Sequence, residues 1–295
     1  MPKSILVTGS NGQLGSELQQ LSGLYGNYTF TFISRNELDL SDSEAIQRWF
    51  VDKTFDVIIN CAAYTAVDKA EAEPSLAKAI NTTAVATLAR IAKEKNISLI
   101  HISTDYVFAG KNYKPYSETD LTDPQGIYGQ TKLEGEQAIL AINPAKSIII
   151  RTSWVYSSFG NNFVKTMLRL GREREELGVI YDQVGSPTSA RDLAQAILSI
   201  IQHPKLDTLT ATEIYHFSNE GVCSWYDFAK AIFELSAIAC HVKPIETKDY
   251  PTPATHPHYS LMNKAKIKNT FNLTIPYWKD SLIDCLEILT GNNPS

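Results

Sequence analysis

Tyr128 and Lys132 stand four residues apart in the segment IYGQTK, a spacing that suits a proton-transfer pair. A helix places positions i and i+4 on one face, so the ammonium of Lys132 can lie beneath the hydroxyl of Tyr128 and lower its pKa. A phenol with a lowered pKa can act as an acid near neutral pH. Much earlier in the chain, the glycine turn TGSNGQLG at 8–15 offers a place for a dinucleotide. Together these features predict proton and hydride transfer on a carbonyl or an alcohol.

An alternation of strand-like and helix-like segments surrounds these residues. Short apolar runs predict strands at 4–8, 28–33, 56–60, 98–102 and 147–151, and periodic patterns predict helices at 13–21, 43–52, 74–95 and 128–142. This alternation indicates an α/β fold of the Rossmann type, a doubly wound parallel sheet with helices on both faces. We expect residues 1–155 to form an NAD(P)-binding domain to which 186–220 returns, and 156–295 to form mainly a smaller C-terminal substrate-binding lobe.

Composition excludes several classes of partner. The net charge of −5 and the pI near 5.7 give no broad attraction for nucleic acid or an anionic membrane. The four cysteines include no close pair, which argues against a zinc or redox motif. The apolar run SILVTGS is too short for a signal peptide, and no run approaches the roughly 20 residues of a membrane span. We therefore expect a cytoplasmic protein that acts on a small molecule.

The glycine turn has the context of a pyrophosphate site. Its glycines follow a strand and precede a helix, so the backbone can approach a pyrophosphate at the helix N-terminus. The β-α-β pattern around the turn favours this interpretation over a turn that binds nothing. The candidate cofactor-binding residues of the turn are Gly9, Asn11, Gly12, Gln13 and Leu14.

Arg35 stands at the tip of the second strand, where an acidic residue would bind an adenosine ribose. A basic residue there favours binding of a 2′-phosphate and hence of NADPH. A solvated surface charge explains Arg35 nearly as well, so we expect the protein to accept NADH too. Asp39 and Leu40 are candidates for lining the adenine. An equal alternative for Asp39 is that it caps the helix that follows. Small residues after the third strand leave room for ribose and phosphate, and the candidates there are Ala62, Ala63 and Tyr64.

Thr104 follows the strand that ends at Ile102. Its hydroxyl can hydrogen-bond the substrate oxygen that Tyr128 protonates, which would orient the substrate and stabilise developing charge. Taken alone, this threonine is better explained as a turn or cap hydroxyl. Its combination with Tyr128 and Lys132 favours the catalytic interpretation.

The chain resembles the extended short-chain dehydrogenases/reductases, and among them the family of dTDP-4-dehydrorhamnose reductases. The resemblance covers nearly the whole length. The glycine turn and the Y-x-x-x-K spacing identify only the superfamily, whereas AYTAVDKAE, RTSWVYSSFGNNF and DQVGSPT are much more specific.

The resemblance implies NAD(P)H-dependent delivery of hydride to C4 of a dTDP-linked 4-keto-6-deoxy sugar, in dTDP-rhamnose biosynthesis. Tyr128 would donate the proton, Lys132 would lower its pKa and bind the nicotinamide ribose, and Thr104 would hold the sugar oxygen. The residues implied to line the sugar pocket are Val67, Asp105, Tyr106 and Trp154, and those implied at the nucleotide end are Asn162 and Gln183. A core aromatic is the alternative for Trp154.

Two positions depart from the family pattern. His256 stands in PTPATHP where many relatives carry arginine, so a diphosphate contact there would have less charge. Arg191 occupies a position where some members use a glutamate in a metal-linked dimer contact. We therefore predict neither a bound metal nor that dimer, and both a monomer and a homodimer remain open.

Two other functions compete with this one. A nucleotide-sugar epimerase or dehydratase shares the scaffold, but a dehydratase needs an extra acid/base pair, and Asp105 is followed by Tyr106 rather than a glutamate. A different stereochemistry at C4 also remains open. A non-catalytic regulatory subunit is the alternative from another class, and it is disfavoured because Thr104, Tyr128 and Lys132 are all present.

Overall fold

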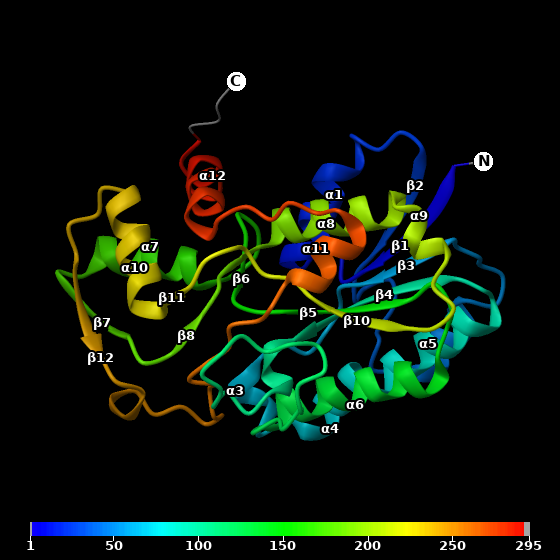
Figure 1. The fold of residues 1–295 in the computed structure, drawn as a ribbon, viewed down its shortest axis with the longest axis horizontal. Coiled ribbons are helices and arrows are strands. Elements are labelled where there is room, and N and C mark those ends of the chain that lie inside the picture. The colour runs from blue at the N-terminus through cyan, green and yellow to red at the C-terminus, as the bar shows by residue number, and fades with distance from the viewer. Residues whose placement is uncertain (1, 292–295) are drawn as a thin grey trace.

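A six-stranded parallel sheet forms the centre of the computed structural model, which describes residues 2–291. The strand order is β10-β5-β4-β3-β1-β2, and every pairing in the sheet is parallel. The strands are β1 (Lys3–Thr8), β2 (Tyr28–Ile33), β3 (Val57–Asn60), β4 (Ser98–Thr104), β5 (Ile148–Thr152) and β10 (Glu213–His216). The inner strands are nearly continuous apolar runs, as expected for a sheet covered on both faces (Figure 1).

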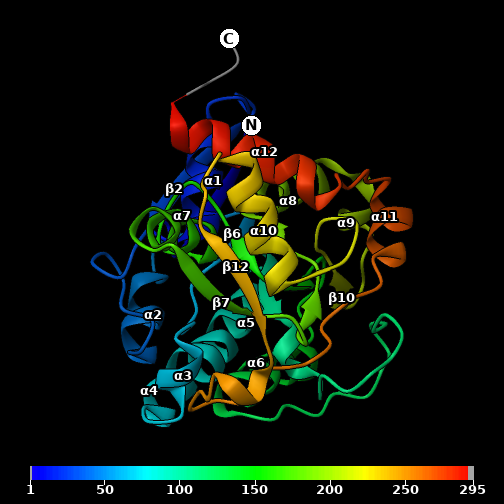
Figure 2. The ribbon, with the colours of Figure 1, turned by 90° about the vertical axis from the view of Figure 1, so that its left-hand side faces the viewer.

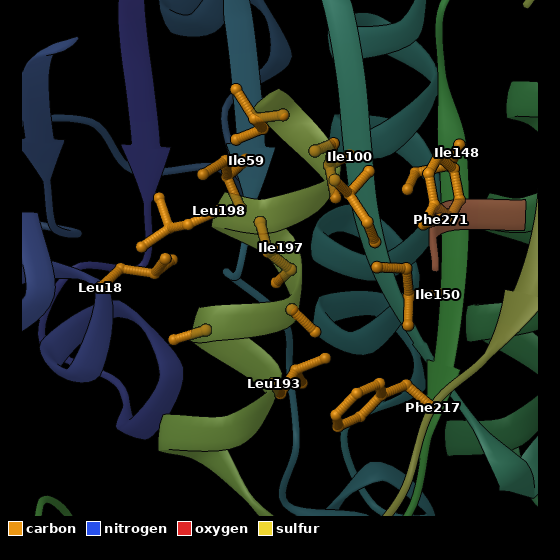
Figure 3. Close-up of a cluster of buried hydrophobic side chains, with 14 of the residues drawn as sticks. Leu18, Ile59, Ile100, Ile148, Ile150, Leu193, Ile197, Leu198, Phe217 and Phe271 are labelled. Atoms are coloured by element: carbon orange, nitrogen blue, oxygen red, sulfur yellow. The ribbon is translucent and has the colours of Figure 1, made fainter. Parts of the chain in front are cut away.

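Helices cover both faces of this sheet. One face packs on α1 (Gln13–Ser22) and α8 (Ala190–Gln202), with α9 (Pro204–Asp207) and α11 (Ala265–Phe271) nearby. In that layer Leu18 and Ile197 point toward Ile59 and Ile100 of the sheet (Figure 3). The opposite face packs on α2 (Ser43–Trp49), α5 (Ala84–Glu94) and α6 (Ile127–Ile142). Two apolar layers thus hold the sheet rigid beneath its carboxyl edge.

A smaller lobe stands beside that edge, at the left of Figure 1 and in front of the sheet in Figure 2. Its elements are β6 (Val155–Tyr156), α7 (Phe163–Glu173), β7 (Glu176–Ile180), β8 (Val184–Gly185), β9 (Thr188–Ser189), β11 (Cys223–Ser224), α10 (Trp225–Leu235), β12 (His241–Ile245) and α12 (Trp278–Thr290). The apolar core of the lobe gathers side chains from α7, α10, α12 and the β7–β12 pair. The short helix α3 (Val67–Ala70) and the 3₁₀ turn at Asp105–Val107 follow β3 and β4 at the carboxyl edge of the main sheet, and α4 (Pro74–Lys78) packs beside α6.

The predicted strands and helices of the first half agree with the structure in type and order, but several bounds differ. The helix predicted at 43–52 ends at Trp49. The segment predicted as one helix at 74–95 consists of α4, a π-helical turn at Ala79–Thr83 and α5. The fourth strand continues to Thr104, two residues beyond its predicted end. The allocation of cofactor and substrate binding to 1–155 and 156–295 stays a prediction.

One buried ion pair joins α6 to the sheet. The guanidinium of Arg151 on β5 donates to both carboxylate oxygens of Glu136, at 3.0 Å from Nε to Oε1 and 2.6 Å from Nη2 to Oε2. Both side chains are at most 3% exposed. Glu136 is thus the partner that the buried charge of Arg151 needs. Within residues 2–291, no helix combines the length and the apolar character that crossing a bilayer requires.

Candidate active site

A cavity of about 900 Å³ opens at the carboxyl ends of the parallel strands. Its walls come from the segments that follow β1, β2, β3, β4 and β5, together with the start of α6 and the loop before α7. This is where doubly wound sheets bind ligands, because the loops there diverge. Every site residue predicted above lines the cavity except Gln183.

The glycine turn packs tightly against the chain that follows β3. Gly9 has a φ of +69°, and a Cβ there would lie 2.8 Å from the backbone of Ala62. A Cβ on Gly15 would lie 2.3 Å from the carbonyl oxygen of Gly9. Gly12 caps α1 without a side-chain hydrogen bond, so the first N–H groups of this helix remain available to an anion.

Arg35 and Asp39 form an exposed pair in the segment that follows β2. The Arg35 guanidinium donates to Asp39 Oδ2 from Nε and Nη2, both at 3.2 Å. Hydrogen bonds from the backbone and hydroxyl of Ser41, with help from Arg35, hold the pKa of the Asp39 carboxyl below its usual value. The cap of α2 is Asp42, which accepts from two backbone N–H groups. The alternative of Asp39 as a helix cap is therefore wrong.

Tyr128 lies in the first turn of α6, close to the backbone after β4. A Cβ on Gly129 would stand 2.3 Å from the carbonyl oxygen of Tyr106, so glycine allows this approach. The rings of Tyr106 and Tyr128 meet edge to face, with centroids 5.4 Å apart. Glu71 accepts from the backbone N–H of Ile127 at 2.8 Å and so anchors the N-terminus of the helix.

Burial raises the pKa of Tyr128 to about 12, while a hydrogen bond with Thr104 opposes the shift. From the sequence we expected the opposite direction, with the ammonium of Lys132 lowering the pKa of Tyr128. Burial is the cause of this difference, and Lys132 Nζ is directed instead to the carbonyl oxygen of Ile102 at 2.6 Å and to His101 Nε2 at 3.3 Å. The phenol is consequently fully protonated at neutral pH, which is the form a proton donor needs.

Lys132 itself is 1% exposed. Burial lowers its pKa to about 8, and the carboxylate of Glu136 acts against that shift. The ammonium therefore carries its charge at neutral pH but is poised close to losing it. Lys132 lies one turn along α6 from Tyr128, as the i to i+4 spacing predicted.

Thr104 and Asp105 form a buried pair next to Tyr128. The Thr104 hydroxyl donates to Asp105 Oδ1 at 3.0 Å and accepts from the backbone N–H of Tyr106 at 3.2 Å. Burial raises the pKa of Asp105 to about 7, and Thr104 opposes the shift. Asp105 Oδ2 has no hydrogen-bond partner among the described residues. Thr104 is thus a turn cap as well as a cavity residue, so the two interpretations are compatible.

Tyr106 and Trp154 extend the wall toward the smaller lobe. The Tyr106 hydroxyl lies 2.9 Å from His256 Nδ1, and His256 Nε2 lies 3.4 Å from Asp68 Oδ1. Trp154 has a φ of +50° and stacks on Trp225 of α10, with centroids 3.7 Å apart. It also lines the cavity, so the alternative of a purely core aromatic does not describe it. Val67 begins α3 on the facing wall.

Of the two residues implied at the nucleotide end, Asn162 lines the cavity and Gln183 does not. The amide of Asn162 donates to Gln13 Oε1 at 3.0 Å and to the carbonyl oxygen of Ser157 at 2.7 Å, which places it beside the glycine turn. Gln183 is buried outside the cavity and donates to Thr247 Oγ1 at 3.2 Å. The structure therefore separates these two residues. Arg191, on α8, contacts Gln20 Oε1 at 3.4 Å.

Sequence reasoning missed several residues at this site. Gly160 and Asn161 line the cavity beside Asn162. His101 lies behind Lys132 and is fully buried. A histidine inside the apolar run SLIHIST was the available signal, because an ionisable side chain in a central strand needs a partner.

Comparisons with known proteins agree over almost the whole chain. The family model of the RmlD substrate binding domain matches residues 3–290. A dTDP-4-dehydrorhamnose reductase from Aggregatibacter actinomycetemcomitans is 41% identical over 285 residues, which cover 94% of this chain and 96% of that protein. The crystal structure of a dTDP-4-dehydrorhamnose reductase from Clostridium acetobutylicum superposes with a TM-score of 0.91 at 42% identity, covering 97% of this chain and 99% of that one. That of a Bacillus anthracis dTDP-4-dehydrorhamnose reductase in complex with NADP gives 0.90 at 38% identity, covering 97% and 99%.

The doubly wound sheet, the glycine turn and the tyrosine and lysine at the carboxyl edge define an extended short-chain dehydrogenase/reductase. The similarity over the full length narrows the class. This chain belongs to the dTDP-4-dehydrorhamnose reductase family.

Proposed function

We propose that this protein reduces the C4 ketone of dTDP-4-dehydro-6-deoxy-L-mannose to give dTDP-L-rhamnose, with NADPH as the reductant. The relatives named above supply the substrate class. The observation that carries the proposal is the shared cavity, in which the protonated phenol of Tyr128, the Thr104 hydroxyl and the glycine turn all face one space. We infer that a nicotinamide bound in this cavity would lie beside the proton donor.

The residues at the turn fit a dinucleotide. The uncapped N-terminus of α1 offers backbone N–H groups to the pyrophosphate, held by Gly9, Asn11, Gly12, Gln13 and Leu14. Arg35, Asp39 and Leu40 would hold the adenosine end, and Ala62, Ala63 and Tyr64 the middle. NADPH supplies the hydride that reduces the ketone carbon when it is bound.

Tyr128 donates its phenolic proton to the C4 oxygen as that carbon receives the hydride. The phenol O–H bond breaks, the alcohol O–H bond forms, and the phenolate afterwards takes a proton from solvent. The ammonium of Lys132, one turn away, stabilises the phenolate and binds the nicotinamide ribose. The hydroxyl of Thr104 turns from Asp105 to the sugar oxygen and stabilises the charge that develops there.

The sugar pocket is assigned to the remaining wall of the cavity. Val67 and Trp154 offer apolar surface to the ring and its methyl group, whereas Asp105 and Tyr106 offer hydrogen-bonding groups. Asn162 is proposed at the junction of the sugar nucleotide and the cofactor, because its amide already contacts Gln13.

The test is NADPH oxidation by the purified protein with freshly prepared dTDP-4-keto-6-deoxy-L-sugar, followed by NMR identification of the product sugar. The same assay is run with NADH, with Tyr128→Phe and with Tyr113→Phe as a matched control. Tyr113 is exposed and lies outside the cavity. Loss of the proton donor is expected to lower kcat at least about a hundredfold.

Turnover to dTDP-L-rhamnose that falls in Tyr128→Phe and persists in Tyr113→Phe supports the proposal. A product with the other configuration at C4 would reassign the sugar while leaving the reductase. Undiminished turnover in Tyr128→Phe would refute the role of the phenol. Bound NADPH without any turnover would favour a regulatory subunit instead.

A further inference from the structure

A line of buried polar side chains crosses the sheet behind Lys132. It runs from Thr8 at the end of β1, through Asn60 at the end of β3 and His101 on β4, to Lys132 on α6. Each of the four residues is at most 1% exposed. Polar side chains this deeply buried are costly unless they bond to one another, so their arrangement calls for an explanation.

The contacts along the line are continuous. Thr8 Oγ1 lies 2.6 Å from Asn60 Oδ1, and Asn60 Nδ2 lies 3.0 Å from His101 Nδ1. His101 Nε2 lies 3.3 Å from Lys132 Nζ. The last residue of β1, which leads into the glycine turn, is therefore connected to the lysine of the active site through two intermediate side chains.

Counting protons restricts what the imidazole can do. Burial, with the nearby Lys132 charge adding to it, holds the pKa of His101 well below its usual value, so the ring is neutral and carries one N–H. An ammonium has three donors and no acceptor. When Lys132 is charged, His101 Nε2 must accept, and the ring proton then sits on Nδ1. That proton requires the amide oxygen of Asn60, with the amide nitrogen turned toward Thr8.

A neutral Lys132 reverses each step of this pattern. His101 Nε2 then carries the proton and donates to the amine, and Nδ1 accepts from the Asn60 amide nitrogen. The amide oxygen accepts from the Thr8 hydroxyl. Because the oxygen and nitrogen of an amide occupy equivalent positions, the same heavy-atom framework accommodates both patterns. The tautomer of His101 and the charge of Lys132 are thereby coupled.

We propose that His101 is a positioning residue whose neutral imidazole, with its tautomer set by Asn60 and Thr8, accepts from Lys132 and keeps its ammonium charged in the active site. This inference rests on the proposed function, in which Lys132 binds the nicotinamide ribose and stabilises the phenolate. The line also fixes Lys132 relative to the end of β1, so that the glycine turn and the lysine keep one spacing.

Other ionisable groups surround Lys132 and enter its pH dependence. On its own helix these are Tyr128 and Glu136, and the Glu136 carboxylate is paired with Arg151 of β5. Asp105 and Cys61 line the same cavity from the segments after β4 and β3. Substitution at His101 leaves all of them in place, so a change in pH dependence is assigned to the contact with Lys132.

Two variants of His101 separate its two contacts. Glutamine carries its terminal amide at the distance of the imidazole Nε2, so His101→Gln retains an acceptor for Lys132. Asparagine reaches only as far as Nδ1, so His101→Asn retains a partner for Asn60 and loses the one for Lys132. Both variants are polar and of similar size, which makes each the control for the other.

The first measurement is the affinity for NADPH from nicotinamide fluorescence, without sugar, across pH values from neutral to alkaline. Binding weakens as Lys132 loses its charge. The wild type and His101→Gln are expected to share one midpoint, while His101→Asn has a midpoint about one pH unit lower, because one charge-assisted hydrogen bond is lost. The pH dependence of kcat for the sugar substrate is expected to follow the same order.

The outcomes distinguish this inference from the proposed function. Separated midpoints in NADPH binding without any sugar turnover would support the role of His101 and refute the assigned reaction. Equal midpoints in all three folded proteins, or equal shifts in both variants, would overturn the proposal. If either variant of His101 fails to fold, Thr8→Val carries the test, because it removes the far hydroxyl without changing side-chain shape. A shift of the midpoint smaller than that of His101→Asn is expected there, and an unchanged midpoint would overturn the coupling.

Discussion

The lowered pKa of Lys132 makes a prediction about stability that needs no substrate. Burial holds this pKa at about 8 in the folded protein, against 10.5 for an ordinary lysine. Because the folded pKa lies below the unfolded one, the unfolded chain binds the proton more tightly. The resulting penalty on folding is fully present below about pH 8, and it is relieved as pH rises toward about 10.5.

The size of the effect follows from this pKa difference. The full penalty is about 3 kcal/mol, since one pKa unit corresponds to about 1.4 kcal/mol. Between about pH 7 and pH 9.5 the wild type recovers about 2 kcal/mol of it. Lys132→Met removes the titrating group, so the free energy of unfolding of the wild type should rise by about 2 kcal/mol relative to the variant over this interval. Taking the difference between the two proteins cancels the contributions that their shared titrating groups make to the pH dependence of the free energy of unfolding.

Urea unfolding followed by tryptophan fluorescence, at both pH values and without cofactor, measures this difference. Lys230→Met, at an exposed position of α10, is the matched control and should run parallel to the wild type. Parallel curves for Lys132→Met and the wild type would refute the reasoning, since Lys132 would then have the same pKa folded and unfolded. If the wild type instead lost stability relative to Lys132→Met as pH rises, the pKa of Lys132 would be higher in the folded protein than in the unfolded chain.

Three further predictions concern the helix that carries the catalytic pair and the cofactor end. Glu136→Leu leaves the Arg151 guanidinium buried without its partner and should lower the free energy of unfolding, measured in urea, by about 3 to 5 kcal/mol. The double variant Glu136→Leu with Arg151→Met should recover most of this stability, and an equal loss in the double variant would contradict the pairing. Gly129→Ala forces a Cβ toward the carbonyl oxygen of Tyr106 and should lower the free energy of unfolding by about 1 to 3 kcal/mol. It should also lower kcat in the reductase assay, and an unchanged kcat would show that the helix can move freely. Arg35→Ala should weaken NADPH binding about tenfold and leave NADH binding unchanged, as titrations with both cofactors would show; equal losses for both would exclude a contact with the 2′-phosphate.

The half of the fold that holds the glycine turn was predictable from local patterns. Its strands are apolar runs such as the one at Val57–Asn60, and their alternation with periodic helices leaves few arrangements. The β7–β12 pair was not predicted, because β12 contains Pro244 and β7 contains a glycine, both unfavourable in strands. The pair is stabilised by contacts across the smaller lobe rather than by its own sequence.

In the candidate site, too, features within one helix could be predicted from the sequence, whereas contacts between different elements could not. The i to i+4 spacing of Tyr128 and Lys132 is a property of one helix and could be predicted. The partners of Lys132 could not, since His101 comes from another element and its approach depends on how α6 packs on β4. Gln183 was inferred from resemblance alone, without a geometric argument, and the structure places its side chain against Thr247 instead of the cavity.

The stacked indoles of Trp154 and Trp225 join the end of the central sheet to the smaller lobe, with their planes 14° apart. Indoles in such close contact couple their electronic transitions, and the coupling gives a paired signal in circular dichroism that vanishes when the rings separate. Trp154 lines the cavity, so ligands that displace it or shift the lobe would alter that signal. The protein therefore carries an intrinsic optical reporter of the contact between these two rings, which can be followed in solution without any added label.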